Sequence, residues 1–384
     1  MTDAPRLSRG KTAVFATIAV LVFTVGTVVL LEGAASNYIF VRDYLGARAP
    51  AHPARPTTVH DTLLGWRHRP GYVGRDEYGP GIALTLDGNG FRRGPARGDS
   101  AGVRARVVCS GDESTLGVGV ADDRGWCALL ERELPGVETV NMGAESYGLD
   151  QSVLRYRRDG ASLAPRVHVL AITQAALRRS VRGDLDGWFK PLLSLNGSRI
   201  VVRNVPVPPQ TGAALRAVAR AHVVDELRAV QLYRRLRGFD RESEISDASD
   251  ARLPLFETLL ADVAAAERAH GGKLVVVYLP TLREVRRDDD ARRRDLAAWT
   301  RDHAIAFIDL TLAMHAMRAD SLDLAYISHV LPGARPTMVG QYSNLGHAWI
   351  ARMIASRLTM LGALDDSSGT GRKLASVAGM SSGH

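Results

Sequence analysis

Hydrophobic residues follow several patterns along this chain, and the first is an uninterrupted run near the N-terminus. Residues 12–31 contain no charged side chain. Because a helix rises 1.5 Å per residue, about 20 apolar residues cross the roughly 30 Å hydrocarbon core of a bilayer. Positive charges that flank such a helix stay on the cytoplasmic side, and three precede this run: Arg6, Arg9 and Lys11. The pattern predicts a transmembrane helix over 12–31, with residues 1–11 in the cytoplasm and the rest of the chain exported.

A cleaved signal peptide is the alternative interpretation of the same run. The small residues at 33–36 (GAAS) would suit a cleavage site. The apolar core of a signal peptide is shorter, however, at roughly 7–15 residues. We therefore favour a retained anchor, and under either interpretation the bulk of the chain lies outside the cytoplasm.

Beyond the anchor, short apolar runs alternate with segments of helical spacing. Five runs predict buried strands: Val107–Cys109, Val137–Met142, Val167–Ile172, Leu274–Leu279 and Ile305–Leu310. Helical spacing follows the first two, over Arg124–Leu134 and Leu149–Arg158. Strands that alternate with helices predict an α/β fold with a parallel sheet covered on both faces, and a site at the carboxyl ends of the strands.

The same pattern predicts the limits of the exported domain. Residues 32–60 are rich in Pro and Ala and predict an interfacial segment and linker, and residues 61–363 predict the folded domain. Residues 181–240 interrupt the alternation, first with a surface excursion over 181–209 and then with an amphipathic helix over 211–238. The charged run 283–294 predicts a solvated helix, and the Ser/Gly-rich residues 364–384 predict a disordered tail.

Composition narrows the function classes. The 384 residues carry a net charge of +8, but the basic side chains are interleaved with acidic ones rather than gathered in one stripe, which argues against nucleic-acid binding. The two cysteines, Cys109 and Cys127, are too few for a C-x-x-C metal site, so we expect neither a metal nor a cofactor. In an exported domain they could form a disulfide or remain two buried thiols, and the sequence leaves both open.

The turn after the first predicted strand carries the most informative motif, GDESTLG at residues 111–117. Together with other segments in the same order, this turn resembles the SGNH (GDSL-type) hydrolase superfamily, in particular its membrane-anchored bacterial members. These segments are LLGWRHRPGY, DGNGFRR, NMGAESYGLDQ, FKP, NVPVPP, YLPT and QYSNLGHAWIA. The resemblance covers most of residues 61–362. It implies a three-layer α/β/α fold with a flavodoxin-like parallel five-stranded sheet, on the periplasmic side of a bacterial inner membrane.

The resemblance also implies that the catalytic residues have been replaced. Glu113 stands at the position of the nucleophilic serine, and Gln341 at that of the histidine. The aspartate position is Met338 or Val339, the oxyanion asparagine is Ala175, and only the oxyanion glycine survives, as Gly143. A glutamine amide accepts no proton near neutral pH, and a carboxylate at the nucleophile position opposes a developing oxyanion. We therefore expect no catalytic residue, and expect Glu113 to accept from the Gly143 N–H or to pair with an arginine.

Three alternatives keep chemistry at this turn. Ser114 or Ser110 could act as nucleophile, with His347 or His329 as base. A glycosidase pair could be drawn from Asp112, Glu113 and Glu145, although nothing in the resemblance supports it. Asp112, Glu113 and His347 could bind a cation, but hydrogen bonding to turn amides is the favoured role for such carboxylates.

The sequence thus predicts a membrane-anchored pseudoenzyme that serves as a structural or binding subunit of a membrane protein assembly. Its expected partners are the lipid bilayer and other membrane proteins, contacted through the anchor, residues 181–209 and the tail 364–384. A glycan is a further candidate ligand. The alternative function, taken from intact relatives, is an O-acyl esterase or acetyltransferase that acts on cell-envelope polysaccharide.

Overall fold

The computed structural model describes residues 9–46, 56–94, 103–185, 188–209, 229, 253–287, 291–329 and 338–365. The chain divides into two compact units, one of Met1–Arg55 with Gln210–Glu244 and the other of Pro56–Pro209 with Ile245–His384. We describe each unit by itself. The predicted tail beyond Asp365 and, except for Ala229, the predicted helix 211–238 lie outside the described residues.

Helix α1 (Arg9–Gly46) contains the predicted membrane segment. Its stretch from Gly10 to Tyr38 is 29 residues long and apolar enough to cross a bilayer, and its apolar side chains are exposed, Phe23 to 77%. The hydroxyl groups of three threonines in it donate to carbonyls one turn earlier (Thr17, Thr24 and Thr27). These polar groups are therefore satisfied within the helix, as a lipid environment requires. A membrane span and a signal sequence both fit this helix.

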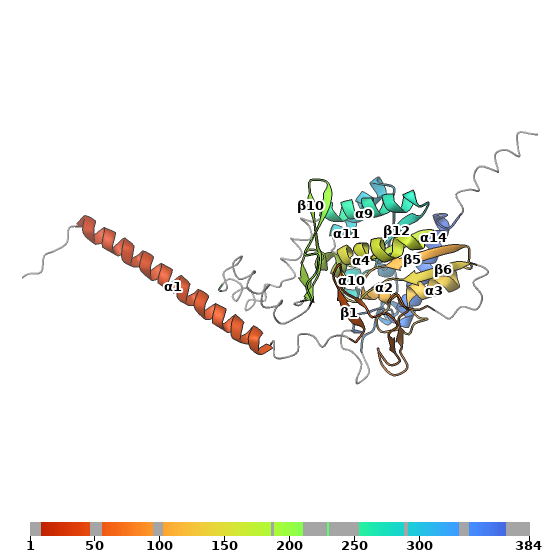
Figure 1. Ribbon diagram of the computed structural model, residues 1–384, viewed down its shortest axis with the longest axis horizontal. Coiled ribbons are helices and arrows are strands. Elements are labelled where there is room, and N and C mark those ends of the chain that lie inside the picture. Colours follow the sequence, from red (N-terminus) through yellow and green to blue (C-terminus); the bar gives the residue numbers. More distant parts are fainter. Residues whose placement is uncertain are drawn as a thin grey trace, which may run out of the picture. The chain divides into compact units, whose positions relative to one another are not determined.

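The second unit is built on a five-stranded parallel sheet in the order β13-β12-β7-β5-β6 (Figure 1). Its strands are β5 (Ala105–Ser110), β6 (Val137–Asn141), β7 (Val167–Ile172), β12 (Lys273–Tyr278) and β13 (Ala306–Asp309). Each strand lies within two residues of a predicted one, because strands buried on both faces form continuous apolar runs. The predicted α/β fold class is confirmed.

Helices cover both faces of this sheet. One face packs against α3 (Trp126–Glu133), α10 (Leu282–Arg287), α12 (Leu310–His315), α13 (Ala319–Leu324) and α14 (Asn344–Met360). The other packs against α4 (Leu149–Arg155), α5 (Gln174–Arg179), α9 (Leu253–Ala269) and α11 (Ala291–Asp302). A π-turn over Tyr156–Gly160 and a 3₁₀ turn over Ala161–Leu163 continue α4. The three layers implied by the resemblance are present.

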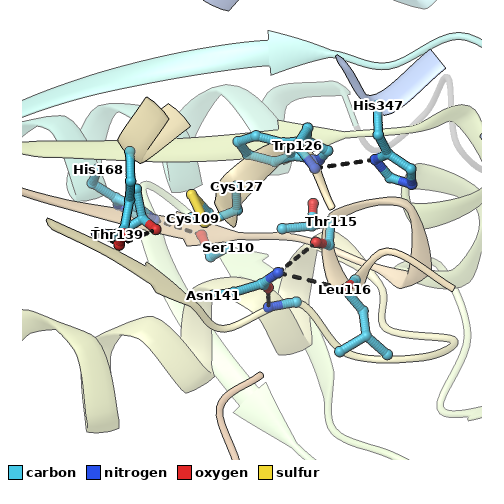
Figure 2. The surroundings of a disulfide bond; sticks show 12 residues. Cys109, Ser110, Thr115, Leu116, Trp126, Cys127, Thr139, Asn141, His168 and His347 are labelled. Carbon is cyan, nitrogen blue, oxygen red and sulfur yellow. Dashed lines mark hydrogen bonds between the residues drawn. A yellow bond between two sulfur atoms is a disulfide. The ribbon is translucent and has the colours of Figure 1, made fainter. Parts of the chain in front are cut away.

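A disulfide joins Cys109 on β5 to Cys127 on α3. Both side chains are fully buried in the cluster between the sheet and α14 (Figure 2). The question that the sequence left open is thus settled in favour of the bond. It links β5 to α3, the helix that precedes β6.

The excursion at 181–209 consists of two small antiparallel pairs, and it is less superficial than predicted. The pairs are β8 (Asp184–Leu185) with β9 (Trp188–Phe189), and β10 (Leu192–Asn196) with β11 (Arg199–Arg203). Leu193 is fully buried in the core beside α9. The Lys190 ammonium, also fully buried, bonds the Asp150 carboxylate on α4 and the carbonyls of Arg179 and Arg182. This buried ion pair fastens the excursion to the domain.

The charged run 283–294 is likewise less solvated than predicted. Glu284 on α10 is buried and accepts hydrogen bonds from the Tyr278 hydroxyl at 2.5 Å and from Thr281. Arg293 on α11 is buried and pairs with Asp309 at the end of β13. The prediction was wrong for these side chains because a charged side chain can be buried when it forms an ion pair or hydrogen bonds inside the protein.

The approach to the sheet contains two short antiparallel pairs, β1 (Thr58–Asp61) with β2 (Gly65–His68) and β3 (Val73–Gly74) with β4 (Leu84–Thr85). Arg92, from the DGNGFRR segment that follows, is buried. Its guanidinium donates to the carbonyls of Leu116, Gly117 and Val120. Arg92 therefore fixes the loop behind the turn at the head of β5.

Candidate functional site

The site begins in the tight turn between β5 and the short helix α2 (Glu113–Leu116). Gly111 has φ +154°, and a side chain there would overlap Thr115 and the carbonyl of Ala171 on the neighbouring strand. Asp112 caps α2, because its Oδ1 accepts from the Ser114 N–H at 2.9 Å. The Gly-Asp pair of the motif therefore holds residue 113 at the carboxyl end of the sheet.

The Glu113 carboxylate is held by a guanidinium and by backbone amides. Arg179, the last residue of α5, donates through Nη2 to Oε1 at 2.6 Å and through Nη1 to Oε2 at 2.8 Å. The Ser146 N–H donates to Oε2 at 3.0 Å, and the amide of Glu113 itself also contributes. Burial alone would raise the pKa of Glu113, but Arg179 and these amides lower it below its ordinary value. The predicted pairing of Glu113 with an arginine is confirmed.

Asp112 lies beside this pair and is buried. The Thr173 hydroxyl donates to its Oδ2 at 2.5 Å, and Arg179 Nη1 lies 3.6 Å from the same oxygen. Burial, together with the charge of Glu113, raises the pKa of Asp112 to about 7. The two carboxyl groups therefore carry less than two full negative charges at neutral pH, against the single positive charge of Arg179.

Gly143 is close to the turn, but its N–H is used elsewhere. It donates to Asn141 Oδ1 at 2.9 Å, and the Asn141 amide in turn donates to the Thr115 carbonyl at 2.9 Å. Of the two partners expected for Glu113, the arginine is therefore the one observed, because Asn141 already accepts from the Gly143 N–H. A side chain at 143 would overlap the backbone of Leu116, so glycine lets the loop after β6 approach α2 closely.

The other residues that the resemblance assigns to catalytic roles have side chains that cannot accept a proton near neutral pH. Ala175, on α5, presents a methyl group. Met338 is buried in an apolar cluster with Tyr78 and Leu116, and Val339 is half exposed. Gln341 accepts through its backbone carbonyl from the Ile327 N–H.

The structure does not join the serine and histidine residues of the alternative catalytic arrangements. His347 Nδ1 accepts from the Trp126 N–H at 3.2 Å, and Figure 2 shows the ring turned toward this amide. Burial, with a contribution from the charge of Arg92, lowers the pKa of His347 to about 3. Among the described residues, no hydrogen bond links the Ser114 hydroxyl to a histidine, and the described contact of His329 is with Ser328 at 3.4 Å.

Ser110 instead bonds a histidine that the sequence analysis did not consider. Its hydroxyl lies 2.5 Å from His168 Nε2 on β7, and His168 Nδ1 lies 3.5 Å from Glu267 Oε1 on α9 (Figure 2 shows the first two residues). The three residues are 1%, 0% and 2% exposed, and the Tyr156 ring stacks on the imidazole at 3.5 Å. A Ser-His-acid series that is closed to solvent cannot reach a substrate, so its role is in the core.

The glycosidase and cation alternatives gain no support from the geometry. Among the described residues, no group of three or more His, Cys, Asp or Glu could hold a metal ion. Asp112 and Glu113 share Arg179, whereas the described hydrogen bond of Glu145 is through its carbonyl, which accepts from Trp66.

Three residues that bond these two carboxylates were not identified from the sequence. They are Arg179, Thr173 and Ser146.

No protein-family model and no curated protein matches this chain. Solved structures that it resembles include a member of the lipolytic protein G-D-S-L family from Veillonella parvula DSM 2008, at 12% identity over 66% of this chain and 98% of that one, with a TM-score of 0.36. The lipase/acylhydrolase from Enterococcus faecalis is similar at 13% identity, 67% and 96% coverage and a TM-score of 0.36. The acetyl xylan esterase AlAXEase is similar at 14% identity, 66% and 99% coverage and a TM-score of 0.37.

Proposed function

We propose that this chain is a membrane-anchored, non-hydrolytic protein whose SGNH-like domain serves as a structural or binding subunit on the extracytoplasmic side. The observation that carries the proposal is the ion pair of Glu113 with Arg179 at the head of β5. A reacting serine would have to occupy this position, and the pair fills it with a carboxylate that two hydrogen bonds hold to one guanidinium.

Ester hydrolysis needs a nucleophile, a base and donors for the oxyanion. Glu113 replaces the first, and Gln341 cannot accept a proton in place of the second. Of the two backbone donors, the Gly143 N–H is taken by Asn141 Oδ1, and the N–H of residue 113 belongs to a residue whose own carboxylate opposes an oxyanion. Each requirement is lost for a separate physical reason, which supports loss of hydrolysis more strongly than one substitution would.

The proposed location follows from α1 and the basic residues that precede its apolar stretch. An exposed apolar helix of this length favours a bilayer, and Arg6, Arg9 and Lys11 favour a cytoplasmic N-terminus. The Cys109–Cys127 disulfide is typical of an oxidising compartment, which supports export of the domain. The transmembrane helix, residues 181–209 and the tail 364–384 remain the proposed contact regions for membrane proteins.

An O-acyl esterase or acetyltransferase is the second candidate, and the observation in its favour is Ser114. This hydroxyl lies one residue after Glu113, beside the Gly-Asp pair of the turn, and Gly143 is kept in the loop after β6. Activity would require Ser114 to find a base that the described structure does not place beside it.

An ester hydrolysis assay separates the two candidates. The full chain in detergent is incubated with p-nitrophenyl acetate and with an acetylated xylooligosaccharide, and its Ser114→Ala variant serves as the matched control. We expect equal and negligible rates for both proteins. Turnover by the wild type that the Ser114→Ala substitution abolishes would reject the proposal in favour of the esterase.

A further inference from the structure

The protein binds the side-chain carboxylate of Glu113 in the same way that a receptor binds a free carboxylate ligand. Both of its oxygens accept from the guanidinium of Arg179, in the parallel two-bond arrangement that recognises a planar carboxylate. The side chains of the pair are only 15% and 18% exposed, so the interaction is partly shielded from water. Such a pair is stronger than an ion pair on an open surface.

The carboxylate and its donors come from three segments that the fold brings together. Arg179 ends α5 and Ser146 lies in the loop after β6, and both donate to Glu113 in the turn after β5. Ser146 has φ +64°, a left-handed conformation that costs free energy in a residue other than glycine. In this conformation its N–H points at Glu113 Oε2, so the backbone is held in an unfavourable state at the point where it donates to the carboxylate.

Among the described residues, the carboxyl group of Asp112 lies beside the pair and opposes the binding of an anion. Its Oδ2 lies 3.6 Å from Arg179, farther than either oxygen of Glu113. Thr173 donates to it, and burial raises its pKa to about 7, which reduces its charge at neutral pH. Arg179 is therefore directed chiefly at Glu113.

We propose that the head of this sheet is a carboxylate-binding site whose occupant is the chain's own Glu113, and that shortening this side chain opens the site to a free small carboxylate. The inference deepens the proposed function and rests on it, because a site occupied by this carboxylate carries a negative charge where an ester hydrolase must stabilise an oxyanion. It also gives Glu113 a role as a built-in ligand that joins three segments.

The test is to refill the site with carboxylates of matched length. The Glu113→Ala substitution removes a CH₂–COO⁻ group, which is the size of acetate. The full chain in detergent is unfolded thermally at pH 7.5 with increasing formate, acetate, propionate or butyrate, and with chloride and inorganic phosphate at equal ionic strength. We expect a lower Tm for the variant, and acetate to raise it by about 3 °C at tenfold excess over its dissociation constant.

Chain length provides an internal control. The Glu113→Gly substitution removes one more carbon atom, so its best ligand should shift from acetate to propionate. Glu113→Gln fills the space with a neutral amide and should respond to no carboxylate. Adding Arg179→Met to the Ala variant removes the receptor, and the acetate response should disappear.

Several results would overturn the inference. Acetate that raises the Tm of the Gln variant and of the wild type equally would indicate a general salt effect. A response of the Ala variant that survives Arg179→Met would place the ligand elsewhere, and an Ala variant that stays unfolded in acetate would show that the site cannot be refilled. Ester turnover tests the proposed function separately, so failure of the carboxylate site and failure of the proposed function give different results.

Discussion

Glu113 and Arg179 determine the electrostatics at the head of the sheet. The guanidinium holds the pKa of Glu113 below its ordinary value, whereas burial and the neighbouring charge raise that of Asp112. Two adjacent carboxyl groups in a buried turn cannot both ionise freely. The carboxyl group that pairs with the arginine keeps its negative charge. The carboxylate is therefore fixed where an ester hydrolase needs an uncharged nucleophile.

The free energy of unfolding should depend on pH through the titration of His347. Its pKa falls from 6.5 to about 3 on folding, so between these values the unfolded chain binds more protons and the native state loses stability as the pH decreases. Asp112 changes in the opposite sense, because its pKa is raised in the native state. The contribution of His347 is obtained from the difference between wild type and His347→Gln, whose carbonyl can still accept from Trp126.

We expect this difference in unfolding free energy to shrink by about 1.4 kcal/mol per pH unit between pH 6 and pH 4, measured by urea denaturation. Above pH 7.5 the difference should be constant. A difference that does not change with pH would mean that His347 titrates normally and is not enclosed as described.

Gly143→Ala should destabilise the domain by about 1–3 kcal/mol, because the added methyl group meets the backbone of Leu116, which cannot move away as a side chain would. The matched control is Gly88→Ala, since a side chain there meets nothing within 4 Å. Urea denaturation gives both values. Equal stability of the two variants would show that the close approach of the loop to α2 is not required.

The sequence predicted that Glu113 and Gly143 lie at the site, but it did not predict which residues they contact. The motif placed Glu113 and Gly143 at the site, because a turn after a strand is a local feature. Arg179 follows β7 by seven residues, and only the tertiary fold shows that its guanidinium reaches Glu113. One missed contact had a local signal, since an asparagine two residues before Gly143 commonly bonds the backbone in this way.

Elements with strong periodicity were predicted well, and irregular elements were not. The five strands are apolar on both faces, so their sequences alone identify them. The excursion at 181–209 contains four prolines and only short strands, and its burial depends on the pairing of Lys190 with Asp150, which are 40 residues apart in sequence. Likewise, Ser110 and His168 are polar residues within apolar strands, and their sequence does not reveal that they face one another.

Lys190 should therefore control the stability of the excursion. Lys190→Met leaves the Asp150 carboxylate buried without its partner, at a cost of about 3–5 kcal/mol. Adding Asp150→Asn should recover part of this loss. Arg318→Met is the control, because its ion pair with Asp320 is exposed and should contribute less than about 1 kcal/mol. Equal effects of Lys190→Met and Arg318→Met, measured by urea denaturation, would contradict the buried pair.

The whole molecule combines an apolar helix with an α/β domain that carries a disulfide. If α1 is a retained anchor, the protein purified from membranes should have an intact mass that includes residues 1–46, and alkaline carbonate should not extract it. A mature chain that begins near residue 36 would show that the helix is a cleaved signal sequence.

The disulfide makes a separate prediction. Cys109 and Cys127 should resist alkylation until a reductant is added.

Loss of the serine nucleophile is the central claim, and active-site labelling tests it most directly. The full chain in detergent is treated with a fluorophosphonate, which modifies an activated serine, and its intact mass is measured. We predict no adduct, at a reagent concentration that fully labels a serine esterase treated in parallel. A stoichiometric adduct that maps to Ser114 or Ser110 would contradict the account.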